Sequence, residues 1–245
     1  MAQAQDTLTI ELKPAGDTAE VIIRHGEAPA NPALPRKLEY GGRLYTPRQF
    51  LSKKLDLYGA RECTFVVDKQ ADRVTFYGQE KETPADVITG ALTLNPDLLA
   101  FQLNGEKRWG TKELWSFLKV RAYFFADALE HAAFVRGLAD FSSRVQTAVV
   151  SKHDNEGNKM DLIERVVQEN SLSGGAGFRL KLPIFQGYQD LVFRVDLGFE
   201  PTSTGVSIFL YSDELLALLY QERERLMGEE AAYFDAWGCA VLTKS

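Results

Sequence analysis

The stretch FRLKLPIFQGYQDLVFRVDLGFEPTSTGVSIFLY, residues Phe178–Tyr211, decides the fold of the C-terminal part of the chain. It contains three runs in which apolar and polar side chains alternate, the period of two that is typical of strands with one buried face. The short segments QGYQD and EPTST join these runs, which predicts a three-stranded antiparallel meander. Pro183 cannot donate a ladder hydrogen bond and favours an edge position or a bulge for the first strand.

The outer face of this meander is predicted to carry cations and aromatic rings. Single-stranded nucleic-acid binders use such faces, with cations for the phosphates and rings for base stacking. The alternative is a solvated or helix-covered face in which Arg194 pairs with Asp196 or Glu200. The candidate nucleic-acid-binding residues are Arg179, Lys181, Arg194, Phe209 and Tyr211.

The segments on either side of the meander predict a helix and further strands. After the meander, Ser212 is expected to cap the helix DELLALLYQERERLM, whose leucine face can cover the strands, and CAVLTK is expected to form a closing strand. Near the N-terminus, CTFVV and RVTFY predict a hairpin with DVITGALTL beside it. Thr7–Leu12 and AEVIIRHG are further strand candidates, and TPRQFLSKKLDLYG predicts a short helix.

A helical pattern runs from Thr111 to about Lys152, and apolar residues recur on one of its faces at spacings of three and four. This stripe extends backward through Asp127 to Phe124. It is either the core-facing side of a long helix or a coiled-coil-like contact with a second subunit. The candidate oligomer-interface residues are His131, Phe134, Leu138, Phe141 and Val145.

Two polar segments resemble functional loops only superficially. HDNEGNKMD, His153–Asp161, fails as a calcium loop because alignment on Gly157 puts Lys152 first and Ile163 twelfth. We interpret it as a connector before the helix MDLIERVVQEN. SGGAG precedes a strand rather than a helix and lacks the Lys-Ser or Lys-Thr pair of a phosphate loop, so it is interpreted as a turn.

Composition narrows the classes of function. The 245 residues are 45% hydrophobic and 25% charged, as in ordinary globular proteins. The net charge of -6 provides no global attraction to nucleic acid or anionic lipid. Cys63 and Cys239 each lie in an apolar stretch and are interpreted as buried thiols. With no membrane-length apolar run and no signal-like N-terminus, we expect no membrane association and a cytoplasmic location.

These patterns predict an α+β fold with a mixed N-terminal sheet, central long helices and a C-terminal three-stranded antiparallel meander covered by a helix. The expected regions are residues 1–110 with the small sheet, 111–172 with the central helices, and 173–245 with the meander and its helix. One continuous domain is the alternative to this division.

Four phrases, EVIIRHG, QFLSKK, NEGNKMDLIERVVQEN and FRLKLPIFQGYQDLVFRVDL, occur in this order. Together they resemble the YfdQ-like family of proteins encoded in tailed bacteriophages and prophages, over roughly Glu20 to Tyr211. The resemblance implies a phage-encoded protein in the bacterial host cytoplasm, from early accessory genes rather than virion structure. It provides no catalytic residues to carry over.

The function expected from these observations is that of a non-enzymatic accessory protein. It would act by self-assembly into a homo-oligomer and by binding a host or phage protein. The alternative is a single-stranded DNA-binding protein of phage recombination or replication. No catalytic, metal or cofactor motif is present, although an enzyme site assembled from carboxylates and His25, His131 or His153 stays open.

Overall fold

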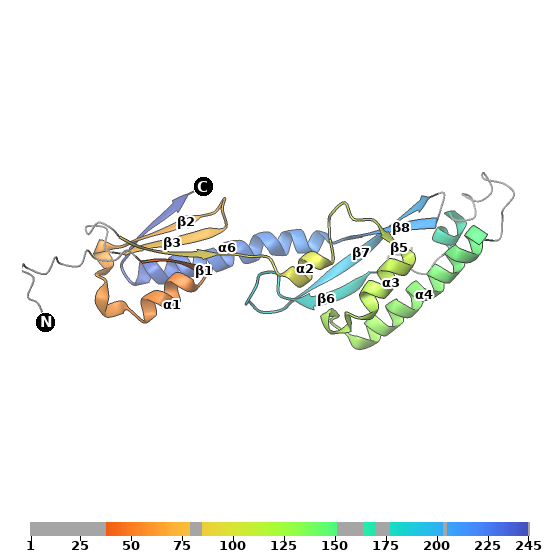
Figure 1. Cartoon of the computed structure of the whole chain (residues 1–245), viewed down its shortest axis with the longest axis horizontal. Helices are drawn as coiled ribbons and strands as arrows, with labels where there is room; N and C mark the ends of the chain where they lie inside the picture. Colours follow the sequence, from red (N-terminus) through yellow and green to blue (C-terminus); the bar gives the residue numbers. More distant parts are fainter. Residues whose placement is uncertain (1–37, 79–84, 151–163, 170–176, 203–204, 245) are drawn as a thin grey trace, which may run out of the picture. The chain divides into compact units, whose positions relative to one another are not determined.

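The computed structural model describes residues 38–78, 85–150, 164–169, 177–202 and 205–244. All of them belong to one compact unit, Lys37–Ser245. Its helices and two sheets confirm the α+β class (Figure 1). The strand candidates before residue 38, the HDNEGNKMD connector, His25 and most of SGGAG lie outside the described residues.

The first sheet is mixed, as predicted, and has the strand order β1-β4-β3-β2-β9. The β2–β3 hairpin and the antiparallel β3–β4 pair confirm the predicted strands, while β1 and β9 pair in parallel with β4 and β2. In the hairpin loop, Asp68 accepts a hydrogen bond from the Ala71 N–H and Asp72 adopts a left-handed conformation. The strands are β1 (Glu39–Arg43), β2 (Thr64–Asp68), β3 (Arg73–Gly78), β4 (Asp86–Ala91) and β9 (Ala240–Lys244).

The second sheet contains the predicted antiparallel meander, in the order β5-β8-β7-β6. β6 (Phe178–Leu182), β7 (Leu191–Thr202) and β8 (Gly205–Tyr211) are the three expected strands, and β5 (Trp109–Gly110) adds a short fourth. β6 lies at the edge, as Pro183 suggested. The chain before α4 covers part of this edge, because the Ala126 N–H donates to the Arg179 carbonyl.

Helices α3 (Thr111–Lys119) and α4 (Ala128–Val150) pack side by side against the inner face of this sheet (Figure 1). The prediction of an uninterrupted helix was wrong, because the chain leaves helical geometry between them and forms the 3-10 turn Ala122–Phe124. Asp127 accepts hydrogen bonds from the N–H groups of Leu129 and Glu130 and so caps α4. Phe124 and Asp127 are therefore not on the α4 stripe.

The α4 stripe lies in the protein's own core. Phe134 contacts Phe178 with 4.8 Å between ring centroids, and Phe141 contacts Phe199 at 5.4 Å. Leu138 and Val145 are also buried, and His131 Nε2 lies 3.1 Å from the Leu118 carbonyl oxygen. These residues are not an exposed oligomer interface, and their burial supports the core-facing alternative.

Helix α6 (Asp213–Ala236) contacts both sheets: β7 of the second, and β2 and β9 of the first. Ser212 is its N-cap, as predicted, and accepts a hydrogen bond from the Leu215 N–H. Near the other end, the fully buried Phe234 ring stacks on Phe65 at 3.9 Å. The remaining described helical segments are α1 (Thr46–Ser52), α2 (Pro96–Ala100), residues 164–168, and the 3-10 turns Leu55–Leu57 and Ala60–Glu62.

Phe234→Ala should lower the free energy of unfolding by about 3–5 kcal/mol, because it removes a fully buried ring that packs on Phe65 and Phe76. Urea unfolding measures this loss. Tyr220→Ala on the same helix, where the side chain is 66% exposed, is the control and should change stability by less than about 0.5 kcal/mol. Equal losses in the two variants would contradict the packing described.

Candidate functional site

The structure brings the five candidate nucleic-acid-binding residues together on one face of the second sheet, here called the outer face. Arg179 lies opposite Arg194 on the neighbouring strand, Asp196 lies opposite Tyr211, and Gly198 lies opposite Phe209. Their strand neighbours Phe178, Leu180, Phe193, Val195, Ile208 and Leu210 are buried on the inner face. The alternation read from the sequence therefore places both faces correctly.

Two of the outer-face cations are paired with carboxylates. Arg179 Nε lies 3.3 Å from Glu130 Oε2, and Arg194 Nε lies 2.8 Å from Asp196 Oδ1. Glu214 also accepts a hydrogen bond from the backbone N–H of Arg194. The alternative in which Arg194 pairs with Asp196 is thus observed, and the positive potential of this face is smaller than its arginines suggest.

The aromatic part of the outer face is partly covered. The Phe209 ring lies over Gly198, where a Cβ atom would stand only 1.9 Å from the ring. The Arg108 guanidinium carbon lies 4.7 Å from the Phe209 centroid, and its Nε is 2.9 Å from Glu200 Oε2. Tyr211 is next to Phe209, at 5.9 Å, and is 37% exposed. Tyr211 is therefore more accessible to a partner than Phe209.

The β6 side of the outer face is the most open. Lys181 is exposed, and Val192, its cross-strand neighbour, is 47% exposed. Within the described residues, no ion pair of Lys181 occurs. This region combines a cation, an apolar side chain and the paired Arg179, which is a composition suited to contact with another macromolecule.

A second polar site centres on Glu230 of α6, which the sequence analysis missed. This side chain is on the buried side of the helix, in line with Leu226 and Phe234, and the residue is only 5% exposed. Its Oε1 lies 3.9 Å from Arg48 Nη1, at the outer limit of an ion pair, and within the described part of the chain Oε2 has no hydrogen-bond partner. An acidic residue at an apolar position of a helix stripe was the available signal.

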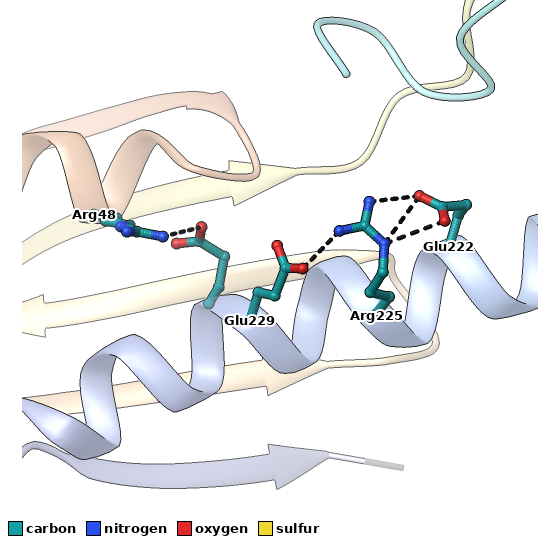
Figure 2. A network of polar contacts seen from close by, with 5 residues as sticks. Arg48, Glu222, Arg225 and Glu229 are labelled. Carbon is teal, nitrogen blue, oxygen red and sulfur yellow. Dashed lines mark hydrogen bonds and ion pairs between the residues drawn. The ribbon is translucent and has the colours of Figure 1, made fainter. Parts of the chain in front are cut away.

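The surroundings of Glu230 compensate its charge poorly. The half-exposed Arg48 guanidinium also lies over the Tyr233 ring, at 4.5 Å from the centroid. On the preceding turns of α6, Arg225 is held between Glu222 and Glu229 (Figure 2). Burial raises the pKa of the Glu230 carboxyl to about 7, Glu229 adds to the rise, and Arg48 opposes it.

Tyr188, from the loop between β6 and β7, is close enough to this site to respond to its charge. Burial, followed by the charge of Glu230, raises the pKa of Tyr188 to about 12. Its ring also contacts Tyr45 edge to face at 6.2 Å. The Glu230 site is therefore a junction between α6, the start of α1 and the β6–β7 loop, and it is too enclosed to act as an open binding surface.

The described residues contain no group of three or more His, Cys, Asp or Glu side chains arranged to hold a metal ion. His131 lies against the Phe125 ring at 4.6 Å, and His25 and His153 are outside the described ranges. None of the described helices combines the length and hydropathy that a membrane crossing requires.

No family model, curated protein or solved structure matches the chain. The resemblance to the YfdQ-like family therefore stays a prediction.

Replacement of Glu230 by Gln should change how stability depends on pH. The pKa of Glu230 is higher in the folded chain than its ordinary value of 4.5, so the folded state holds this proton more tightly. The contribution of Glu230 to the free energy of unfolding is therefore largest at low pH, and it is lost as the pH rises from about 4.5 to about 7. Glu230→Gln should remove this decline and be more stable than the wild type at pH 8 by on the order of 2 kcal/mol.

Urea unfolding between pH 4 and pH 8 provides the measurement, and Asp235→Asn, at an exposed carboxylate on the same helix, is the matched control. The control should keep the decline. If the curves of the wild type and Glu230→Gln ran parallel over the whole range, Glu230 would not be the titrating group.

Proposed function

We propose that this protein is a phage-encoded, non-enzymatic accessory protein that binds another macromolecule through the outer face of its second sheet. The proposal is supported by the four phrases that resemble the YfdQ-like family and by the exposed side chains of this face. The observation that carries it is the open β6–β7 region, where Lys181 and Val192 are exposed and Arg179 lies two positions along β6 from Lys181.

A protein partner fits the charge pattern best. Arg179 and Arg194 are each within ion-pair distance of an acidic side chain, so positive and negative groups alternate over a short distance. Protein interfaces combine apolar and tyrosine side chains with a polar rim, and charges of both signs on that rim can be matched by complementary charges of a protein partner. A nucleic acid would instead favour a surface of one positive sign.

Single-stranded nucleic acid is the second candidate because of one specific arrangement. Arg108 stacks on Phe209, the Tyr211 ring lies beside it, and Lys181 adds an exposed cation on the same face. A base stacked on Tyr211 would place its phosphates within reach of such cations. This candidate requires the strand to displace or bridge the carboxylates that pair with the arginines.

Combined replacement Arg179→Ala and Lys181→Ala tests both candidates. For a protein partner, a photo-crosslinking amino acid at Val192 in producing bacteria should form a discrete adduct, and the double replacement should reduce its yield at least about tenfold. The matched control is Lys53→Ala with Lys54→Ala, which removes two exposed lysines near α1 and should leave the adduct unchanged.

The nucleic-acid candidate is measured by the anisotropy of labelled oligo-dT over a salt series. If it holds, binding should weaken steeply with salt, and loss of two phosphate contacts should reduce the logarithmic salt slope by about 1.4. Unaltered adducts together with absent or unaltered DNA binding would remove the outer face from consideration.

A further inference from the structure

The two cysteines of the chain, Cys63 and Cys239, lie next to each other in the first sheet, although they are 176 positions apart in the sequence. Both are buried, as predicted, with exposed fractions of 2% and 4%. Cys239 Sγ donates a hydrogen bond of 3.1 Å to the Cys63 carbonyl oxygen. The thiol of one cysteine therefore lies against the backbone of the other.

The parallel pairing of β2 with β9 accounts for this contact. Thr64 lies opposite Ala240 in the register, and each cysteine immediately precedes its member of this pair. Neighbouring strands lie about 4.8 Å apart, and residues at the same position in two parallel strands direct their side chains to the same face. The two Cα atoms are therefore expected within the range of about 4.4–6.8 Å that a disulfide bond requires.

The end of α6 holds Cys239 in this position. Gly238 adopts a φ of +89°, the left-handed conformation with which a helix commonly ends. The Cys239 N–H donates to the Phe234 carbonyl, which is one of the two hydrogen bonds of a Schellman motif. Phe234 in turn stacks on Phe65, two residues after Cys63. The end of the helix and the start of β2 are thus fixed together where the two cysteines lie.

The position of β9 provides a route by which an oxidant reaches these thiols. β9 is an edge strand that pairs only with β2 within the described residues, and four of its five residues are exposed. Lys244 Nζ, at the far end of β9, lies 3.0 Å from Asp68 Oδ2, and a surface ion pair of this kind adds little stability. Local opening of this edge would therefore expose Cys239 while the rest of the sheet stays folded.

We propose that Cys63 and Cys239 form a reversible disulfide bond in the presence of an oxidant, and that this bond fastens β9 to β2. The reaction breaks two S–H bonds and forms one S–S bond, and two protons and two electrons leave the protein. A small disulfide such as oxidised glutathione accepts them: one protein thiolate attacks it, the second displaces the mixed disulfide, and two molecules of reduced glutathione are released. The pair lies in the first sheet, so this site goes beyond the proposed function of the outer face.

Equilibration of the full chain with mixtures of oxidised and reduced glutathione tests the bond. After N-ethylmaleimide has blocked the thiols in denaturant, the bonded chain should carry no maleimide group, and peptide mapping should find Cys63 linked to Cys239. The equilibrium constant for the bond should be at least about thirtyfold larger in the folded chain than in concentrated urea, because the fold holds the two thiols together. Thiols that stay reduced, links between separate chains, or equal constants with and without urea would each overturn the proposal.

Hydrogen exchange of the β9 amides measures whether the bond fastens this strand. Oxidised glutathione should slow their exchange in the wild type at least about tenfold, because the bond opposes local opening of the edge. The variant with both Cys63→Ala and Cys239→Ala is the matched control, and its exchange should be the same with and without oxidised glutathione. If the bonded wild type exchanged as fast as the reduced chain, β9 would not be fastened and that part of the proposal would be wrong.

Discussion

The arrangement around Ser212 is the constraint on which the second sheet and α6 both depend. At this residue the chain passes from β8 into α6, and its backbone groups lose their strand partners while the side chain is nearly fully buried. Ser212 Oγ donates to the Arg194 carbonyl and accepts from the Leu215 N–H, while Asn104 satisfies both backbone groups of Ser212. Asn104 can do so because it adopts a left-handed conformation that asparagine tolerates better than most residues.

This junction determines which surfaces are available. It sets the direction in which α6 leaves the second sheet, and it places Leu215 beside the segment that carries Leu103, so that an apolar groove of about 180 Å³ forms between them. It also brings Glu214 to the backbone N–H of Arg194, which adds a negative charge to the outer face. A polar network with every member satisfied thus defines a groove and lowers the positive potential of a neighbouring surface.

Glu230 is also a buried polar group, but it lacks the hydrogen-bond partners that Ser212 has. Its carboxylate is buried on α6 opposite the start of α1, yet the described residues provide only a distant arginine and leave one oxygen without a donor. The group responds by holding its proton, since a neutral carboxyl costs less to bury than a charged one. Nearby, Arg225 is fully engaged by Glu222 and Glu229 and is not available to Glu230 (Figure 2).

The sequence by itself determined the elements whose signals are local. The alternation over Phe178–Tyr211 is enough to place the meander and both of its faces, and the hairpin at Thr64–Gly78 and the Ser212 cap follow from short patterns. The start of α4 also has a local sequence signal, because Asp127 followed by Glu130 at the third helical position is typical of a helix N-terminus. The long apolar stripe across this position nevertheless favoured the prediction of one uninterrupted helix.

Only the tertiary structure decided what depends on residues far apart in the sequence. Parallel pairing of β9 with β2 places Ala240 opposite Thr64, two residues far apart in the sequence, and no local pattern encodes that choice. The apolar stripe of α4 fits a core and an interface equally well, and only its contacts with Phe178 and Phe199 assign it to the core. The same holds for the burial of Glu230 and for the apolar groove beside Leu215, because both arise where several elements meet. A sequence pattern reports only which face of one element is apolar.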